Sequence, residues 1–230
     1  MLSRTGYNGN SRQPAHAGQR QLPPVDSCHL DDPIETMGGA SMPFARNAEI
    51  YGENEPAEYV YKVASGAVRT YKILSDGRRQ IGAFYLPGDV FGLENGDEHT
   101  FSAEAITDSK VTIIKRSALL SLAARDGNVA RKLWALTSGE LRRLQHHALA
   151  LIKTAQERVV GFLLEMAARG PSGNQIELPM SRQDIADYLG LTIETVSRTL
   201  SQLQSSAAID LPNSRCIVLR NRAALGRLDA

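Results

Sequence analysis

The chain has 230 residues, a formal net charge of +1, and 42% hydrophobic against 22% charged residues. This composition is typical of a soluble globular protein with one or two domains. No apolar run approaches the roughly 20 residues of a membrane-spanning helix, and Met1–Gln21 lacks the apolar core of a signal peptide. The sequence therefore predicts a cytoplasmic protein with no membrane partner, and its net charge alone does not indicate nucleic-acid binding.

Cysteines and histidines give little support to a metal site or a catalytic site. Cys28 and Cys216 lie far apart without a Cys-x-x-Cys spacing, which favours plain thiols. His99 lies in a turn-like stretch without partner groups, which favours a surface histidine. His146 and His147 are adjacent on an expected helix, so they point about 100° apart and cannot chelate one ion together. We expect no catalytic residue, no metal and no cofactor.

The N-terminal segment 1–42 is rich in Gly, Asn, Gln, Ser, Pro and His and shows no sustained hydrophobic period. It is predicted to be a flexible arm.

Residues 43–125 change to short apolar runs separated by turn residues. The Asp76-Gly77 pair joins two of the runs as a hairpin. Regularly spaced short strands predict an antiparallel sandwich, roll or barrel. The expected strands are Tyr59–Val63, Ala67–Leu74, Gln80–Leu86, Val90–Leu93, Phe101–Ala105 and Lys110–Lys115.

Residues 126–155 are helical in pattern, and the pattern continues without proline to Arg169. Leucine and alanine recur at three- and four-residue steps from Leu133 to Ala155. An apolar seam of this length needs a partner helix, which predicts a homodimer formed along this segment. Gly161 is a candidate boundary between this helix and the next.

Residues 156–230 contain a helix-turn-helix pattern at Ser181–Leu203. Ala186 allows two helices to approach, Gly190 permits a left-handed turn, and Val196 anchors the second helix. Ser181 with Asp184 caps the first helix, and Thr192 caps the second. Short apolar runs at 175–178, 209–211 and 216–219 add a β wing, so a winged helix-turn-helix domain that binds double-stranded DNA is expected.

The exposed front of the second helix carries Ile193, Glu194, Ser197 and Arg198. We expect Arg198 to contact O6 and N7 of a guanine and Glu194 to accept from a base amino group, while Ser197 and Ile193 meet thymine methyl groups. Four further residues are expected to contact DNA phosphates. These are Arg182, Thr192, Thr195 and Arg215.

The order of these segments and several motifs resemble the CRP/FNR family of bacterial transcription regulators, and within it the FixK-like branch. The resemblance runs from about Phe44 to Leu219. Its most specific part is the Glu-x-x-Ser-Arg motif ending at Arg198. The other motifs are Ser65-Gly66-Ala67-Val68-Arg69, Pro87-Gly88-Asp89-Val90-Phe91-Gly92-Leu93 and the helix Glu157–Met166.

The resemblance implies an α+β chain with an N-terminal antiparallel β-roll of the cyclic-nucleotide-binding type, a long dimerisation helix and a C-terminal winged helix. It further implies TTGAT half-sites in inverted repeat. The hairpin residues Asp76, Gly77, Arg78 and Arg79 resemble a family surface that contacts RNA polymerase. Together these features predict a homodimeric transcription regulator that acts as an activator.

Two departures from the family concern its control. Members that bind cyclic AMP hold its phosphate with an Arg-Ser pair, where this chain has His99-Thr100. A buried phosphodiester would lack its bidentate charge partner, so a cyclic-nucleotide effector is not expected. The arm has only Cys28 in place of the cysteine cluster that holds an iron–sulfur centre. FixK-like members are commonly controlled through their own synthesis.

The sequence is also compatible with two alternatives. One is a sensor whose β-roll binds an unidentified small molecule that controls DNA binding. The other is a β-barrel enzyme with a helical appendage, and the lack of convergent catalytic groups speaks against it.

Overall fold

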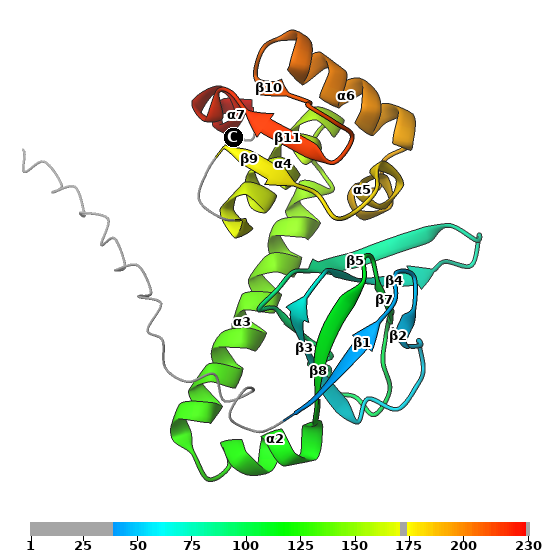
Figure 1. The fold of residues 1–230 in the computed structure, drawn as a ribbon, viewed down its shortest axis with the longest axis vertical. Helices are drawn as coiled ribbons and strands as arrows, with labels where there is room; N and C mark the ends of the chain where they lie inside the picture. Colours follow the sequence, from blue (N-terminus) through cyan, green and yellow to red (C-terminus); the bar gives the residue numbers. More distant parts are fainter. Residues whose placement is uncertain (1–38, 171–173, 229–230) are drawn as a thin grey trace, which may run out of the picture. The chain divides into compact units, whose positions relative to one another are not determined.

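A computed structural model describes residues 39–170 and 174–228. Cys28 and most of the predicted N-terminal arm lie outside the described residues. The first described strand begins at Ala40, so the last residues of the segment predicted as an arm belong to the sheet. The fold is α+β, as the sequence predicts, and Figure 1 shows its elements in chain order.

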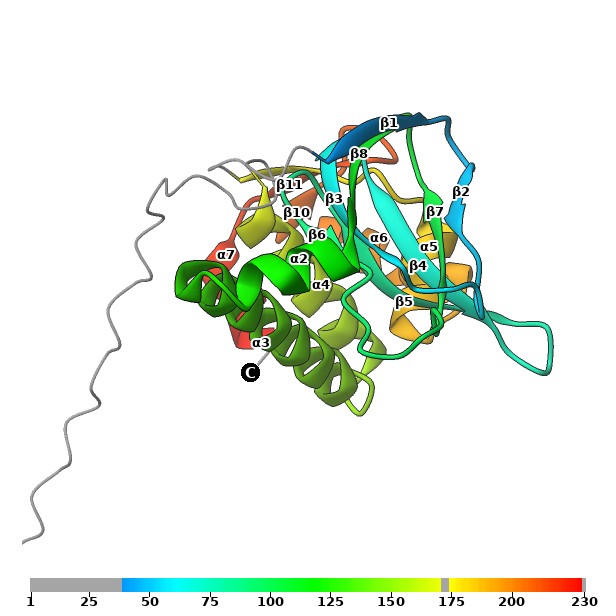
Figure 2. The ribbon, with the colours of Figure 1, turned by 90° about the horizontal axis from the view of Figure 1, so that it is seen from below.

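Residues 40–115 form two four-stranded antiparallel sheets, ordered β1-β8-β3-β6 and β2-β7-β4-β5. The sheets face each other (Figure 2), and buried side chains from both sheets make one core cluster. This pair of sheets is called the β-roll below. Its strands are β1 (Ala40–Phe44), β2 (Glu49–Tyr51), β3 (Tyr59–Ser65), β4 (Val68–Ile73), β5 (Arg79–Tyr85), β6 (Val90–Phe91), β7 (Ser102–Ala105) and β8 (Ser109–Lys115).

The predicted hairpin at Asp76-Gly77 is present between β4 and β5, which pair antiparallel from Val68↔Tyr85 to Ile73↔Arg79. Gly77 has a φ of 82°, a left-handed conformation that glycine adopts without steric cost. The two strands β1 and β2 were not predicted, because they fall in the polar stretch before Tyr59 where the alternation of apolar residues is weak.

His99 corrects one prediction, because it is buried instead of lying at the surface. The residue is 1% exposed, and its ring stacks on Tyr51 with ring centroids 3.6 Å apart. Backbone bonds tie the segment to the start of the roll: the His99 amide donates to Glu55, and the Asn54 amide donates to the His99 carbonyl. These long-range bonds turn a polar, turn-like stretch back onto the aromatic core.

Three helices follow the β-roll, namely α2 (Arg116–Ala123), α3 (Gly127–Ala150) and α4 (Ala155–Arg169). The long helical segment breaks at residues 151–154 and not at Gly161, which lies inside α4. The break follows from capping, since Thr154 and Glu157 form a capping box that starts a new helix. Side chains of α2 and α3 pack on the β-roll in a separate core cluster that includes Val60, Leu119 and Val129.

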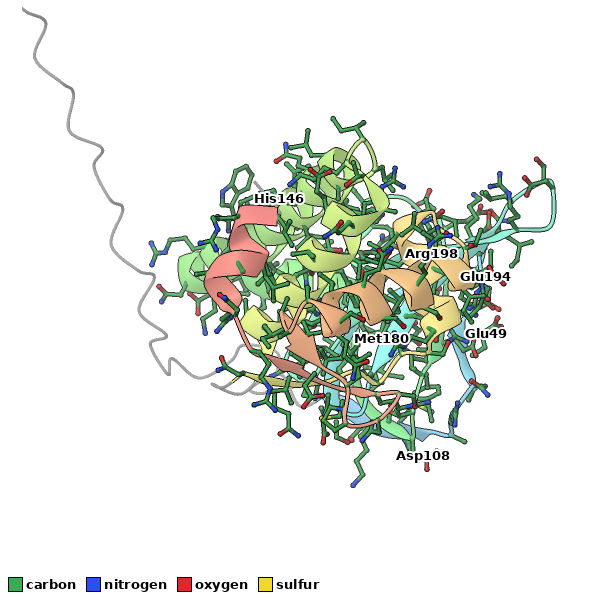
Figure 3. The ribbon with its side chains drawn as sticks, turned by 90° about the horizontal axis from the view of Figure 1, so that it is seen from above. Glu49, Asp108, His146, Met180, Glu194 and Arg198 are labelled. Atoms are coloured by element: carbon green, nitrogen blue, oxygen red, sulfur yellow. The ribbon has the colours of Figure 1, made fainter. Side chains whose placement is uncertain are left out.

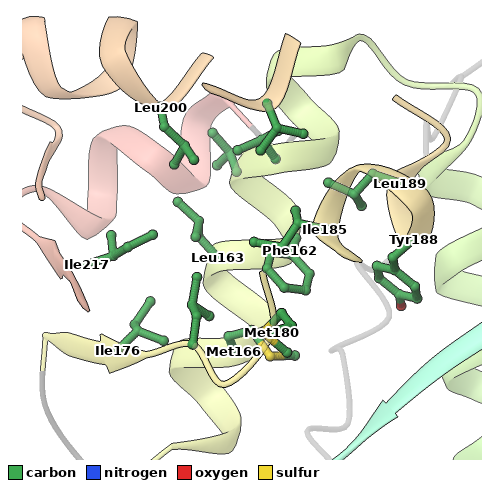
Figure 4. Close-up of a cluster of buried hydrophobic side chains, with 14 of the residues drawn as sticks. Phe162, Leu163, Met166, Ile176, Met180, Ile185, Tyr188, Leu189, Leu200 and Ile217 are labelled. Atoms are coloured by element: carbon green, nitrogen blue, oxygen red, sulfur yellow. The ribbon is translucent and has the colours of Figure 1, made fainter. Parts of the chain in front are cut away.

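The C-terminal part holds a three-stranded sheet, ordered β10-β11-β9, and three helices. A large apolar core joins α4 to these elements (Figure 4). The elements are β9 (Gln175–Glu177), α5 (Arg182–Leu189), α6 (Ile193–Ser205), β10 (Ile209–Asp210), β11 (Cys216–Leu219) and α7 (Arg222–Leu228). None of the helices in the described part of the chain is long and apolar enough to cross a membrane.

Candidate nucleic-acid interface

Helices α5 and α6 form the predicted helix-turn-helix. Ser181 caps α5 in a capping box with Asp184, and Thr192 caps α6 by accepting from the Thr195 amide at 3.3 Å. Gly190 ends α5 in the left-handed region, with φ 62° and ψ 41°, which lets the chain turn sharply into α6. Ala186 and Val196 are both fully buried where the two helices meet. The local sequence therefore fixes the angle at which α6 leaves α5.

The outer face of α6 carries the four side chains expected to contact bases. Ile193, Glu194, Ser197 and Arg198 are all exposed, and Figure 3 shows Glu194 and Arg198 on the same helix. Among the described residues, no hydrogen bond or ion pair engages the Arg198 guanidinium. It is therefore available for an external partner.

The Glu194 side chain is an ionised carboxylate and therefore a hydrogen-bond acceptor. Its own backbone amide and the Thr192 side chain hydrogen-bond to the carboxylate and lower the pKa of Glu194 below its ordinary range. The group is ionised at neutral pH, and an ionised carboxylate only accepts hydrogen bonds. This suits a contact with a base amino group.

The residues expected to contact phosphates lie around this face. Thr192 is exposed, and its hydroxyl is 3.1 Å from that of the half-buried Thr195. Arg182 opens α5 and is half-buried; burial lowers its pKa, but an arginine remains charged. Arg215 stands beside the wing and donates to the Pro179 carbonyl at 3.0 Å, so part of its guanidinium is already used within the domain.

The hairpin between β4 and β5 separates its four predicted residues into two groups. Asp76, Gly77 and Arg78 are exposed at the tip, where Arg78 donates to Asp76 at 2.7 Å. Arg79 turns inward instead and is bound by two carboxylates of α5, Asp184 at 2.6 Å and Asp187 at 2.8 Å.

Asp184 was predicted only as a helix cap, but its carboxylate also makes contacts outside α5. One carboxylate oxygen, Oδ2, accepts from the Ser181 amide and hydroxyl at 2.9 and 2.8 Å. The other, Oδ1, accepts from Arg69 of β4 at 2.8 Å and from Arg79 of β5 at 2.6 Å. The arginines precede it by 115 and 105 residues, so no local pattern could have indicated the contact.

A cavity of about 320 Å³ lies between the β-roll and α3, lined by Tyr51, Phe91 and Leu93 on one side and by Glu140 and Leu141 on the other. Burial raises the pKa of Tyr51, so its hydroxyl remains protonated. The half-buried Glu94 also lines this cavity, and its carboxylate lies 3.4 Å from Nδ1 of the buried His99. Both ring nitrogens of His99 and one oxygen of Glu94 lack hydrogen-bond partners within the described residues.

Metal binding receives no support from residues 39–170 and 174–228, where no three His, Cys, Asp or Glu side chains are grouped to hold an ion. Cys216 is buried and unpaired.

Comparison with known proteins agrees with this arrangement. Residues 41–126 match the cyclic nucleotide-binding domain family, and residues 157–228 match the Crp-like helix-turn-helix domain family. The fold and interface thus define a transcription regulator with a cyclic-nucleotide-binding-like domain and a helix-turn-helix DNA-binding domain.

Individual relatives place the chain more narrowly. It is 53% identical over 206 residues to the nitrogen fixation regulation protein FixK of Azorhizobium caulinodans, covering 86% of this chain and 83% of that protein. It is 41% identical to FixK of Rhizobium meliloti over 85% of this chain and 93% of that protein. The structure of FixK2 from Bradyrhizobium japonicum superposes with a TM-score of 0.81 at 58% identity, covering 84% of this chain and 98% of that one. The chain belongs to the FixK-like branch of the CRP/FNR family.

Proposed function

We propose that the chain is a transcription activator that binds, as a homodimer, to palindromes built from TTGAT half-sites and does so without a cyclic nucleotide. The single observation that supports this most is the outer face of α6. Four side chains able to read base edges, Ile193, Glu194, Ser197 and Arg198, are exposed there. The Arg198 guanidinium has no partner among the described residues, and the ionised Glu194 carboxylate is exposed beside it, so both can pair with base edges in the major groove.

The dimer is supported by an uncovered apolar stripe along α3. Trp134 is 76% exposed, Leu141 57% and Leu144 50%. Trp134 and Leu141 are seven residues apart, as are Leu144 and Leu151, and this is the spacing of helices that pair side by side. We therefore assign the stripe to α3 of a second copy. Two α6 helices across the dimer axis would read half-sites roughly 34–36 Å apart.

Independence from cyclic nucleotides is supported by His99. A cyclic nucleotide brings a buried phosphodiester that needs a bidentate cation. His99 occupies the position of the family's arginine and stacks on Tyr51 inside the roll. It offers no guanidinium fork to a phosphate.

For activation we propose that the tip of the β4–β5 hairpin contacts RNA polymerase through Asp76, Gly77 and Arg78. Arg79 belongs to the same predicted surface, but its guanidinium is occupied by α5. We therefore assign Arg79 the role of holding the base of the hairpin while its neighbours remain exposed.

Base reading is tested by Arg198→Ala, with Arg227→Ala as the control. Arg227 is also exposed, so its loss removes the same charge away from α6. Arg198→Ala should cost ~1–3 kcal/mol per half-site and abolish the preference for guanine at one position of each half-site. Arg182→Ala should instead weaken binding to all sequences alike and reduce the salt dependence.

The measurement is a titration of each variant against a TTGAT palindrome, the same DNA with the guanine replaced, and scrambled DNA. An equal loss on palindrome and scrambled DNA for Arg198→Ala would contradict base reading. Sedimentation of the free protein in the same buffer tests the dimer, and a monomer at concentrations that saturate the palindrome would contradict it.

A second candidate function is a sensor gated by a small molecule. The cavity between the β-roll and α3, with the unpartnered polar atoms of His99 and Glu94 beside it, is the observation that favours it, because buried polar groups ordinarily have partners. DNA affinity of the purified protein with and without a low-molecular-weight cell extract separates the two functions. A change that requires the extract would favour the sensor.

A further inference from the structure

Asp184 connects helix α5 to the β-roll. Asp184 is 3% exposed, and both its carboxylate oxygens accept hydrogen bonds, one within the helix cap and one from two arginines of the β-roll. A buried carboxylate with this many donors has one position in which all are satisfied. The cap and the arginines therefore fix α5 relative to β4 and β5.

Both arginines are themselves anchored. Arg69 of β4 lies opposite Glu104 of β7 in the sheet register and binds it at 2.9 Å, with side chains 9% and 14% exposed. Arg79 bridges Asp184 and Asp187, which lie on one face of α5. Shifting α5 would separate charges that are buried on Arg69 and Asp184 and half-buried on Arg79, and leaving a buried charge unpaired is costly.

Apolar packing reinforces the same contact. Ile81 and Phe84 of β5 belong to the core cluster that contains α4, α5 and α6. The Phe84 ring lies 5.2 Å from that of Tyr188 on α5, and Gln80 donates to the Tyr188 carbonyl at 3.3 Å. The β-roll and the helix-turn-helix thus share one core.

The other side of the β-roll is attached to the proposed dimerisation helix. Val60 and Ile114 of the roll pack in one cluster with Val129 of α3, and the Tyr85 hydroxyl contacts Glu140 of α3 at 3.1 Å. A continuous chain of contacts therefore runs from α3 through the roll to α5. Because Gly190 and the buried Val196 lock α6 against α5, the orientation of α6 follows that of α5.

The contact leaves the outer face of α6 free. Ile193, Glu194, Ser197 and Arg198 are exposed while Asp184 is bound to both arginines. The face of α6 that is proposed to read bases is therefore accessible in the orientation that the arginines stabilise.

We propose that Arg69 and Arg79 are positioning residues for DNA recognition, which act through Asp184 to set the orientation of α6 and thereby the half-site spacing that the dimer accepts. This inference rests on the proposed function, because spacing has meaning only for two linked α6 helices. Holding this orientation in the free protein also raises the affinity for DNA, because a smaller fraction of the molecules is in orientations that cannot bind.

The test compares Arg79→Gln with Arg78→Gln, the same change at the neighbouring, exposed position. Each variant is titrated against the TTGAT palindrome at its preferred spacing and against palindromes with one base pair inserted or deleted. The quantity measured is the affinity for the preferred spacing divided by the affinity for each altered spacing. Arg79→Gln should lower this ratio by about 2- to 30-fold, and Arg78→Gln should leave it unchanged.

Two comparisons separate positioning from a general loss of stability. Arg198→Ala should weaken binding at every spacing and keep the ratio. Arg79→Lys retains the charge but loses the fork that bridges two carboxylates, so its ratio should lie between those of wild type and Arg79→Gln. It also serves as the test variant if Arg79→Gln does not fold.

An unchanged ratio in folded, dimeric Arg79→Gln would overturn the proposal. Tighter binding at the preferred spacing would overturn it as well, because the contact would then hold an inhibitory orientation. If the wild-type protein shows no spacing preference at all, the proposed function as a dimer on palindromes is refuted, and the orientation contact needs a separate test. Hydrogen exchange of α5 in the free protein then decides: lower protection in Arg79→Gln than in Arg78→Gln supports the orientation contact, and equal protection refutes it.

Discussion

Asp184→Asn is a sharp test of how the β-roll holds the DNA-binding domain. Asparagine can still accept from Ser181 through its amide oxygen, so the cap of α5 is largely retained. Its amide nitrogen is a donor, however, and cannot replace the oxygen that accepts from Arg69 and Arg79. The substitution therefore removes two charge-assisted hydrogen bonds while keeping the volume and the helix.

The expected loss in the free energy of unfolding depends on which ion pairs each arginine retains in the variant. A hydrogen bond to a charged group contributes about 1.5–3 kcal/mol, so two bonds give about 3–6 kcal/mol. Arg69 still binds Glu104 and Arg79 still binds Asp187, so neither cation is left unpaired. We therefore expect the low end, a loss of about 3 kcal/mol in the free energy of unfolding.

The assay is urea unfolding followed by circular dichroism at one fixed protein concentration, because dimerisation makes the midpoint depend on concentration. With a slope of about 2–3 kcal/mol per molar urea, the midpoint should fall by about 1–1.5 M. Asp97→Asn makes the same chemical change at an exposed loop position and should leave the midpoint in place.

A loss below about 1 kcal/mol would refute the reasoning. It would mean that the cost of burying the charges cancels their attraction, as occurs in some buried ion pairs. The apolar contacts of Phe84 and Ile81 would then be sufficient to dock the helix-turn-helix on the roll.

Three further predictions concern the dimer, activation and pH. Trp134→Glu should place a charge in the α3 stripe, convert the dimer to monomers in sedimentation, and weaken binding to the palindrome far more than to a single half-site. Arg78→Glu should leave DNA affinity intact and abolish transcription in a purified system with RNA polymerase; reduced DNA binding would contradict the hairpin assignment. Burial, and secondarily Arg158, lower the pKa of His147, which stacks on Tyr188 at 4.2 Å. The unfolded chain therefore binds the proton more readily, so stability should fall as the pH drops through about 6.5, and His147→Gln should flatten that dependence in urea titrations at several pH values.

The helix-turn-helix could be predicted from the sequence because each of its requirements is local. The Ser181 and Thr192 caps, the left-handed Gly190 and the small Ala186 act within a few residues of where they stand, and all are present as expected. The β4–β5 hairpin is local in the same sense, since Asp76-Gly77 determines its turn. Helical periodicity alone predicts which side chains lie on the outer face of α6.

Gly161 was a wrong candidate for the helix boundary, which lies near residue 152, and the reason is partly local. Thr154 and Glu157 are a capping box visible in the sequence, but the apolar period runs through the break and conceals it. Arg158 completes the break by donating to the carbonyls of Lys153 and Leu189, the second of which belongs to α5. That second acceptor depends on tertiary packing.

Most strands of the β-roll, the helix-turn-helix and the side chains that face outward on α6 could be predicted from the sequence, whereas β1, β2 and the end of α3 could not. Tertiary packing alone buries His99 against Tyr51, turns Arg79 away from the hairpin tip, and joins Asp184 of α5 to the β-roll. The physical reason is range. Caps, turns and amphipathic faces are set by neighbours a few residues apart, whereas a buried charge takes its partners from strands more than a hundred residues away, and these partners are defined only once the sheets have packed.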